Sequence, residues 1–465
     1  SRGLGDVYKR QVVGNPPWVN WTNLPEGYRK HLEKLAKDYK LILPSLWHRS
    51  TDLSVLFSYV VMDKYLKENG NFGFLITQSV FQNPATAPFR RFNINGTPFR
   101  VLKVFDFVKV KPFERANNRT SILICVKGLK TEYPIRYIKY DILLQPPSST
   151  DDLENALKKL KKTELLAIPI KRSDESSPWL VISHRLLSKL DTILKPSTYE
   201  AYLGIYYSVT GAFWVKIIDY SDKDNILVEN IVTKRAKATP KLIKTLLEKE
   251  LIYPLVRGED IDKWMLKVNR DEDGKVVFST YSIVPCILKD TKIYELYERE
   301  MKTNYPKTYN FLLQNKDIIT SVKKRLYVNA FKSGKPFFWL FNSSVALRPY
   351  KVAWKYISSG MRATVLTEVN DKYLGRRVPA VYEKVVFIPV RSENEAHYVC
   401  AVLNSSIIDL IVRSCVVETQ IAPHILKLFY IPEFNERNNI HTVSYTHLRA
   451  HETEADIVCR LLLEK

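Results

Sequence analysis

Apolar residues recur along the chain with two different spacings, which predict alternating helices and strands. Residues 53–65 carry apolar side chains at an approximately helical spacing and follow Asp52, a residue type that often caps helices. The sequence Lys-Glu-Asn-Gly at 67–70 predicts the end of this helix. The short apolar run Phe72–Thr77 then predicts a buried strand. Helix, glycine stop and buried strand in this order indicate one step of a doubly wound α/β sheet.

Two further strands are predicted downstream, over residues 101–110 and 121–126. A short loop that contains Phe113 and Asn118 joins them. The two strands therefore predict an antiparallel hairpin, which we expect at the edge of the sheet. Upstream of this unit, residues 25–39 predict a short polar and basic helix.

The second half of the chain predicts a separate domain. A charged helix over 151–162 and an acidic, serine-rich stretch predict a linker at 166–180, between domains at 12–165 and 181–436. The second domain mixes strand and helix patterns and predicts an α+β fold. Its expected elements are strands within 204–215, 251–264, 335–339, 348–358 and 428–431, and helices from 305 onward and within 395–412.

Composition narrows the class of protein. The formal net charge is +22, which favours a polyanionic partner such as nucleic acid, although dispersed surface lysines would give the same total. The five cysteines are widely scattered without a C-x-x-C pair, which argues against a disulfide framework or a zinc site and predicts a cytoplasmic protein. Neither cysteine nor histidine spacing predicts a metal site. The apolar runs are too short to cross a bilayer, so we expect no membrane association.

The strongest chemical signal is Asn15-Pro16-Pro17-Trp18, which follows the small apolar run at 12–14. The two prolines restrict the backbone, and Pro16 keeps Asn15 out of the helical region. The Asn15 side-chain oxygen and the Pro16 carbonyl could then accept from the two N–H bonds of an aromatic amine. Those contacts would stabilise the charge that develops as the amine attacks a methyl donor, and Trp18 could stack on an extruded base. A strand followed by a Pro-Pro turn with a surface tryptophan explains the same four residues.

Asn-Pro-Pro-aromatic after an apolar strand resembles the catalytic motif of the amino-group DNA methyltransferases of the N6-adenine class. In that family an aspartate-headed helix, a Gly-Phe-Ile-Thr-like strand and a phenylalanine-containing loop before a Thr-headed strand follow the motif. The chain has this order, with Asp52, the strand at 72–77, Phe113 and Thr120. The resemblance implies the C-terminal half of a doubly wound, Rossmann-like methyltransferase sheet. It also implies substrate-binding roles for Phe113, as a wall of the base pocket, and for Asn118.

The resemblance implies S-adenosyl-L-methionine as the cofactor. In the family, a Gly-rich cofactor loop and an acidic ribose ligand precede the catalytic motif. We find no replacement after the motif, because the sequence at Gly211 lacks a G-x-G, so the chain should lack most of the cofactor site. Residues 1–11 and 443–465 resemble translated sequencing-adapter sequence, and we expect both to be foreign. On this interpretation the chain is a fragment of a larger protein, which could carry a fused or associated nuclease.

The second domain resembles the target-recognition domain of type IIG restriction-modification and phage-exclusion methyltransferases. The likeness rests on Thr210-Gly211, the PLVRGED sequence at 254–260, KVAW at 351–354 and LNS at 403–405. Independently of that likeness, lysines and arginines interleave with aromatic residues over 332–356, which suits contact with phosphates and bases. Core packing explains many single residues equally well. Our predicted contacts to double-stranded DNA are Arg257, Arg348, Lys355 and Arg362.

Together these patterns predict a fragment of a site-specific DNA adenine-N6 methyltransferase, active in restriction-modification or phage defence. Its reaction would move a methyl group from S-adenosylmethionine to a flipped adenine. A methyltransferase acting on an RNA base or a protein glutamine is one alternative, which the long basic second domain disfavours. A non-catalytic DNA-binding specificity module is the other alternative, and the expected lack of cofactor residues keeps it open.

Overall fold

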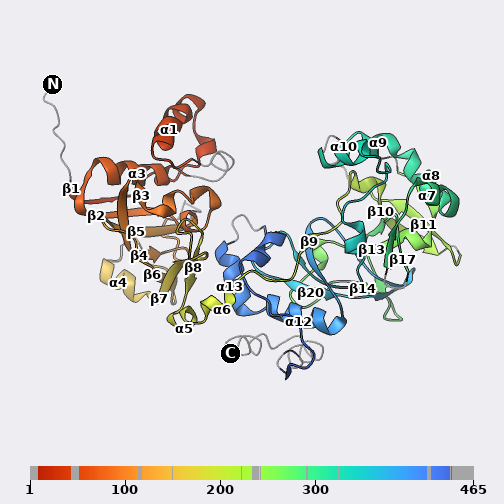
Figure 1. The fold of residues 1–465 in the computed structure, drawn as a ribbon. Coiled ribbons are helices and arrows are strands. Elements are labelled where there is room, and N and C mark those ends of the chain that lie inside the picture. Colours follow the sequence, from red (N-terminus) through yellow and green to blue (C-terminus); the bar gives the residue numbers. More distant parts are fainter. Residues whose placement is uncertain are drawn as a thin grey trace. The chain divides into compact units, whose positions relative to one another are not determined.

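The computed structural model divides into two compact units (Figure 1). It describes residues 9–42, 52–113, 118–148, 150–220, 222–232, 240, 242–289, 292–322, 325–415, 420–439 and 441. We call the residues up to Lys195 unit 1 and the residues Pro196–Arg413 unit 2, and each is described by itself. Most of the two adapter-like ends lies outside the described residues, but Lys9–Gln11 extends the first strand of unit 1.

Unit 1 is built on one mixed sheet with the strand order β1-β2-β5-β4-β6-β7-β8, in which β3 pairs with β4. The pairs β1–β2 and β4–β6 are parallel and the others are antiparallel. The strands are β1 (Lys9–Gly14), β2 (Leu66–Thr77), β3 (Asn93–Ile94), β4 (Thr97–Asp106), β5 (Thr120–Lys127), β6 (Ile135–Ile142), β7 (Leu160–Pro169) and β8 (Trp179–Ile182). The α-helices are α1 (Glu26–Asp38), α3 (Leu53–Lys64), α4 (Leu153–Lys158), α5 (His184–Leu187) and α6 (Leu190–Ile193).

The predicted helix after Asp52 and the strand after it are confirmed as α3 and β2. The helix stops earlier than predicted, at Lys64, because residues from Leu66 onward already belong to β2. The predicted hairpin is also confirmed, since β4 and β5 pair antiparallel. Its predicted place at the sheet edge is wrong, because β5 also pairs with β2 and β4 also pairs with β6.

The predicted linker at 166–180 does not separate two units in the structure. Residues 166–169 belong to β7, and β8 begins at Trp179 and pairs with it. Trp179 is fully buried and stacks on Phe81 with ring centroids 4.6 Å apart, so this segment is part of the core of unit 1. The division falls after Lys195 instead.

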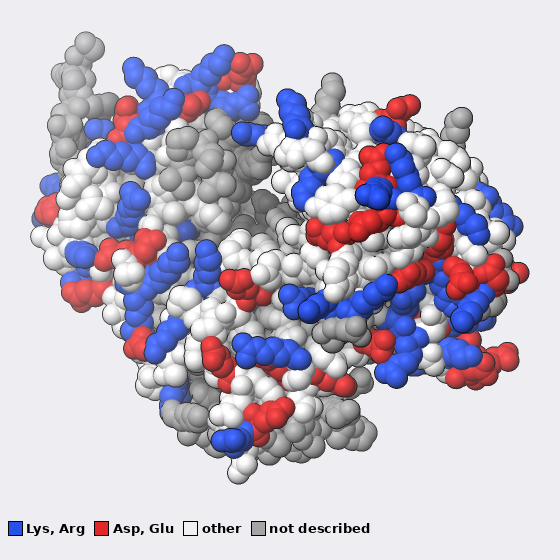
Figure 2. Space-filling model, turned by 45° about the vertical axis from the view of Figure 1, so that its right-hand side comes forward, with Lys and Arg blue, Asp and Glu red and all other residues white. Residues whose placement is uncertain are grey.

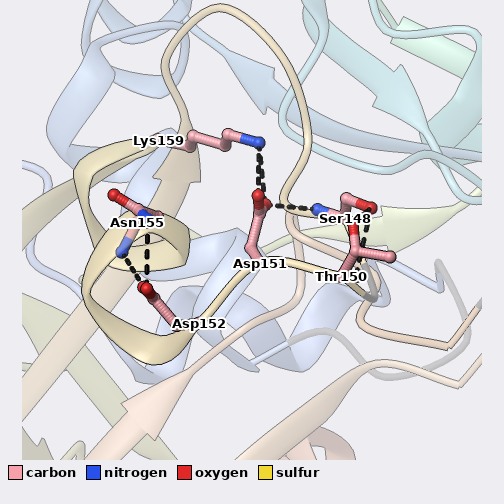
Figure 3. Close-up of polar contacts among 6 residues, drawn as sticks. All are labelled: Ser148, Thr150, Asp151, Asp152, Asn155 and Lys159. Atoms are coloured by element: carbon pink, nitrogen blue, oxygen red, sulfur yellow. Dashed lines mark hydrogen bonds and ion pairs between the residues drawn. The ribbon is translucent and has the colours of Figure 1, made fainter.

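The predicted helix at 151–162 is shorter than expected. Asp152 caps α4 by accepting from the Asn155 backbone N–H at 2.8 Å, and the helix ends at Lys158 before β7 begins (Figure 3). The Asp151 carboxylate accepts from the Ser148 backbone N–H at 2.7 Å and from Lys159 Nζ at 2.7 Å. These contacts lower the pKa of the Asp151 carboxyl, chiefly through Lys159. These contacts therefore hold the start of α4 and the residue after the helix within the connection between β6 and β7.

Unit 2 contains several smaller sheets. The largest has the order β12-β11-β10-β16-β13-β23, and a four-stranded sheet has the order β20-β19-β24-β9. A second four-stranded sheet has the order β14-β15-β21-β22, and β17 pairs with β18. The strands are β9 (Tyr202–Leu203), β10 (Trp214–Tyr220), β11 (Asn225–Asn230), β12 (Lys244–Glu248), β13 (Ile252–Val256), β14 (Asn269–Arg270), β15 (Val276–Val277), β16 (Tyr281–Ile283), β17 (Cys286–Lys289), β18 (Lys292–Glu295), β19 (Tyr350–Lys355), β20 (Ala363–Leu366), β21 (Val369–Asp371), β22 (Gly375–Arg377), β23 (Ala380–Val381) and β24 (Val385–Val390).

Helices cover parts of unit 2 and confirm two predicted helical segments. They are α7 (Glu298–Asn304), α8 (Pro306–Gln314), α9 (Lys316–Thr320), α10 (Arg325–Lys332), α11 (Ser343–Ala346), α12 (Glu393–Leu403) and α13 (Ser406–Cys415). The break between α12 and α13 falls at Asn404, whose side chain bonds both the backbone N–H and the carbonyl of Ala363. In the described part of the chain no single helix is long and apolar enough to span a membrane; α12 and α13 reach that length only together, with a 58° bend.

The predicted strand at 348–358 is confirmed as β19, but three others are wrong in whole or part. Residues 335–339 form a turn and not a strand. Phe337 and Phe338 both pack near the Tyr309 ring, whereas neighbours on a strand would face opposite sides. Within 204–215 the chain makes a 3₁₀ turn at 210–212 before β10. Residues 428–431 form no strand, although Phe429 and Ile431 are buried, because burial alone produced the alternating pattern.

Arg90 is a fully buried cation that joins two segments of unit 1. Its Nη1 donates to the carbonyls of Val80 and Asn83, both at 2.8 Å, and its Nε donates to those of Ser176 and Ser177, at 2.9 and 3.1 Å. Burial lowers the pKa of Arg90 to about 10, so the side chain stays charged at neutral pH.

We expect Arg90→Ala to lower the free energy of unfolding of unit 1 by about 3–5 kcal/mol, because four backbone carbonyls lose a charged donor and the substitution leaves space at a fully buried site. Denaturant unfolding followed by circular dichroism measures this change. The matched control is Arg91→Ala, which removes an exposed neighbour and should change stability by about 0.5 kcal/mol or less. Equal stability of the two variants would contradict the assignment.

Candidate functional site

The Asn15–Trp18 loop begins where β1 ends, beside the carboxyl end of β2. Gly14 pairs with Phe74 of β2 in parallel register. A Cβ atom on Gly14 would lie 2.8 Å from the Phe74 ring, so only glycine allows this approach. In the loop, Asn15 is exposed while Pro16 is buried. The carboxamide is therefore presented to solvent from a backbone that is fixed on the sheet.

Trp18 has a fixed orientation in this loop. Its Nε1 donates to the Leu75 carbonyl of β2 at 3.1 Å. Its ring meets Phe113 edge-on, with ring centroids 5.4 Å apart and planes at 68°. Phe113 remains 39% exposed. The structure thus places the predicted base-pocket wall directly beside the predicted stacking residue, although the two lie far apart in the sequence.

Asn118 lies at the same end of the sheet, in the segment that leads into β5, because Thr120 of β5 pairs with Thr77 at the end of β2. It is exposed, and the next residue, Arg119, accepts from the Gln78 backbone N–H through its carbonyl at 2.8 Å. Gln78 directly follows β2, so the Asn118 segment is attached near the strand end that also holds Trp18. The substrate-binding roles of Phe113 and Asn118 remain predictions.

Asp52 connects the start of α3 to the end of β2. The sequence predicted it only as a helix cap. One carboxylate oxygen accepts from the Ser54 backbone N–H at 2.8 Å and from the Ser54 hydroxyl, and the other accepts from the Thr77 hydroxyl. The next backbone N–H, of Leu53, donates to the Val19 carbonyl at 3.0 Å. Burial raises the pKa of the Asp52 carboxyl, while these hydrogen bonds oppose the rise. Asp52 therefore links the helix start, the end of β2 and the chain just after Trp18.

Two of the four predicted DNA contacts come together in unit 2. Arg257 and Lys355 line one cavity of about 450 Å³. Arg362 lies apart, with Nη1 2.7 Å from Asp262 Oδ1, and Asp262 has its pKa lowered by Lys267 first and by Arg362 as well. Arg348 is exposed.

The backbone at Arg348 is held by a buried lysine. Lys351 donates from Nζ to the Arg348 carbonyl at 2.6 Å and to the Pro379 carbonyl at 3.2 Å. Burial lowers the pKa of Lys351 to about 7. The alternating basic pattern of 348–355 therefore includes a lysine that serves the fold and cannot reach DNA.

The described residues around Asn15 include the aromatic pair Trp18 and Phe113 and the polar side chains of Asp52 and Thr77. Asp52 and Thr77 bond to each other, and we assign no described residue to a methyl donor. In the same described set, no group of three or more His, Cys, Asp or Glu side chains lies close enough to hold a metal ion.

Comparison with known proteins agrees with the resemblance found in the sequence. Residues 11–113 match the family model of the Eco57I restriction-modification methylase, so this segment of unit 1 is similar to that family. The type II methyltransferase M.HincII of Haemophilus influenzae is 25% identical over 236 residues, which cover 49% of this chain and 42% of that protein. The chain thus spans less than half the length of this relative.

Two solved restriction-modification enzymes are among the structural neighbours. The type IIL enzyme MmeI in complex with DNA aligns over 95% of this chain and 49% of its own, with 11% identity and a TM-score of 0.44. The type IIG restriction endonuclease BpuSI aligns over 98% of this chain and 54% of its own, with 12% identity and a TM-score of 0.34.

Replacing Asp52 tests its place in the site. We expect Asp52→Ala to lower the free energy of unfolding by about 1–2 kcal/mol, since α3 loses its cap and Thr77 its acceptor. Asp52→Asn retains an oxygen for the Ser54 N–H and should be more stable than the alanine variant. Denaturant unfolding of both variants at pH 7 measures the difference, and equal losses would contradict the capping role.

The stability difference between the wild type and Asp52→Asn should also depend on pH. Because the folded-state pKa of Asp52 is raised, the folded protein binds this proton more tightly than the unfolded chain does. The wild type should therefore lose stability relative to Asp52→Asn as the pH rises above about 4. Parallel stability curves from pH 4 to 8 would show that the carboxyl is not perturbed.

Proposed function

We propose that this chain provides the adenine-binding surface and the DNA-binding unit of a site-specific DNA adenine-N6 methyltransferase. The observation that carries the proposal is the Asn15–Trp18 loop at the carboxyl end of β1, with Trp18 fixed against Phe113. This loop lies in the segment that matches a restriction-modification methylase. In open α/β sheets, ligands bind outside the carboxyl ends of the strands, which is where this loop stands.

The residues of the loop suit a planar amine. The exposed Asn15 carboxamide oxygen and the Pro16 carbonyl act as acceptors for the two N–H bonds of the target amine. Both acceptors favour the charge that develops on nitrogen during attack, and the rigid Pro-Pro backbone holds them in advance. Trp18 and Phe113 offer aromatic surface to an adenine that has left the duplex. S-adenosylmethionine, the proposed cofactor, supplies the methyl group.

The charge of the chain supports a DNA substrate. The formal net charge is +22. Lysine and arginine side chains are spread over the face drawn in Figure 2 among fewer acidic ones, rather than gathered into one uninterrupted patch. A spread of this kind suits phosphate contacts at several points along a duplex. We also propose a cytoplasmic location, where such a methylase meets its DNA.

The test is methyl transfer by the complete gene product that carries this sequence, incubated with genomic DNA and labelled S-adenosylmethionine. We expect label in N6-methyladenine. Asn15→Ala should reduce the rate by about 10²–10³-fold, because an acceptor aimed at the developing charge is lost. The control is Asn23→Ala, an exposed asparagine eight positions later, which should retain the wild-type rate.

The other outcomes separate the alternative functions. Label in RNA or in protein glutamine instead of DNA would favour a methyltransferase of a different substrate class. No label in any substrate, with salt-sensitive DNA binding retained, would favour a specificity module without catalysis. An unchanged rate for Asn15→Ala would exclude the proposed role of the loop.

A further inference from the structure

A cavity of about 450 Å³ in unit 2 gathers basic and aromatic side chains from separate parts of the sequence. Lys355 ends β19, and Lys384 directly precedes β24, the antiparallel neighbour of β19, where Lys355 is paired with Val385. The Tyr356 backbone N–H also donates to the Lys384 carbonyl at 3.1 Å. The two lysines are therefore held on neighbouring segments that line the cavity, an arrangement that the sequence does not reveal.

Part of the cavity lining is aromatic. Trp214 and Tyr382 both contribute to it, and their rings meet edge-on with centroids 4.9 Å apart. Ile357, at the rim, is 57% exposed. Cationic groups beside an apolar, aromatic lining match the chemistry of a nucleotide unit, which has an anionic phosphate attached to a sugar and a base.

The cations of the cavity differ in their pairing. Arg257 is neutralised by its own turn, because its guanidinium contacts Glu259, lies 3.9 Å from Asp260 and donates to the Ser279 hydroxyl at 2.9 Å. Neither Lys355 nor Lys384 forms an ion pair with any other described residue. Lys384 Nζ lies 5.7 Å from the centre of the Tyr356 ring, a contact that leaves its charge unneutralised. Both ammonium groups can therefore meet an anion, while the Arg257 guanidinium contacts the Glu259 carboxylate.

We propose that this cavity is a phosphodiester-binding site for duplex DNA, in which Lys355 and Lys384 neutralise the backbone. Glu259 competes with the DNA phosphate for Arg257, and its side chain is 67% exposed, so the pair can open towards solvent. This competition weakens the binding of any duplex. Arg257 becomes available only to a duplex whose phosphate displaces Glu259 from it. This inference rests on the proposed function only in taking DNA as the ligand, and it requires no methyl transfer.

The first experiment measures binding of the full chain to a fluorescein-labelled duplex of random sequence by anisotropy, over a range of salt concentrations. Each phosphate contact contributes about 0.9 to the slope of log K against log salt. We expect Lys355→Ala/Lys384→Ala to reduce that slope by about 1.8 and Lys355→Arg/Lys384→Arg to restore it. The control, Lys223→Ala/Lys289→Ala, removes two exposed lysines of unit 2 and should leave the slope unchanged.

The second experiment tests the competing carboxylate. Glu259→Gln should bind the same duplex several-fold more tightly than the wild type, because Arg257 is released. That gain should vanish when Arg257→Ala is added, which shows that the effect passes through the guanidinium. A gain that persists in the double variant would overturn the competition between Glu259 and DNA.

The outcomes for this cavity and for the proposed methyl transfer are distinguishable. If the wild type binds duplex DNA but the pocket double variant retains its slope, or the control loses as much, the cavity assignment is overturned while methyl transfer to DNA still stands. If the wild-type chain binds no duplex DNA, the cavity assignment also fails. Methyl transfer to adenine is measured in a separate experiment with the complete gene product, so its result does not depend on either binding result.

Discussion

The carboxyl end of β2 is the fixed point on which the candidate site depends. Leu75 holds the Trp18 indole through its carbonyl, and Thr77 holds the Asp52 carboxylate through its hydroxyl. Asp52 in turn starts α3, whose first backbone N–H, from Leu53, reaches the Val19 carbonyl. Loss of these few polar contacts would free the chain on both sides of the Pro-Pro turn, and the Asn15 carboxamide would lose its fixed direction.

The energetic balance at Asp52 explains why several donors converge on one carboxylate. Burying a charge is unfavourable, and the raised pKa of Asp52 expresses that cost. Hydrogen bonds to a charged group stabilise by about 1.5–3 kcal/mol each, so the contacts from Ser54 and Thr77 can offset the burial. Arg90 follows the same rule elsewhere in unit 1, where backbone carbonyls surround a buried cation. In both places the polar side chain is kept because it joins segments that are distant in sequence.

Several cations of unit 2 that the sequence counts as available for DNA are already paired or buried in the structure. The sequence counts Arg257, Arg362 and Lys351 equally as cations of a basic region. In the structure Arg362 pairs with Asp262, Arg257 pairs with Glu259, and Lys351 is buried under backbone carbonyls. Lys355 keeps its place in the cavity, and Lys384, which the pattern did not single out, joins it there. For the proposed binding of DNA, what matters is therefore which cations remain unpaired, not how many there are.

The sequence by itself determined the local features of this protein. The capping residue Asp52, the apolar run of β2 and the rigid Asn15–Trp18 loop depend on interactions between near neighbours in the chain, and their patterns are visible in a single sequence. The same patterns could not place β5 inside the sheet or assign Trp179 to the core of unit 1, since β5 depends on pairing with the distant strand β2 and Trp179 depends on stacking against the distant Phe81. Only the tertiary structure brought Phe113 to Trp18 and Lys384 to Lys355, because such pairs are selected by packing and strand register across long stretches of sequence.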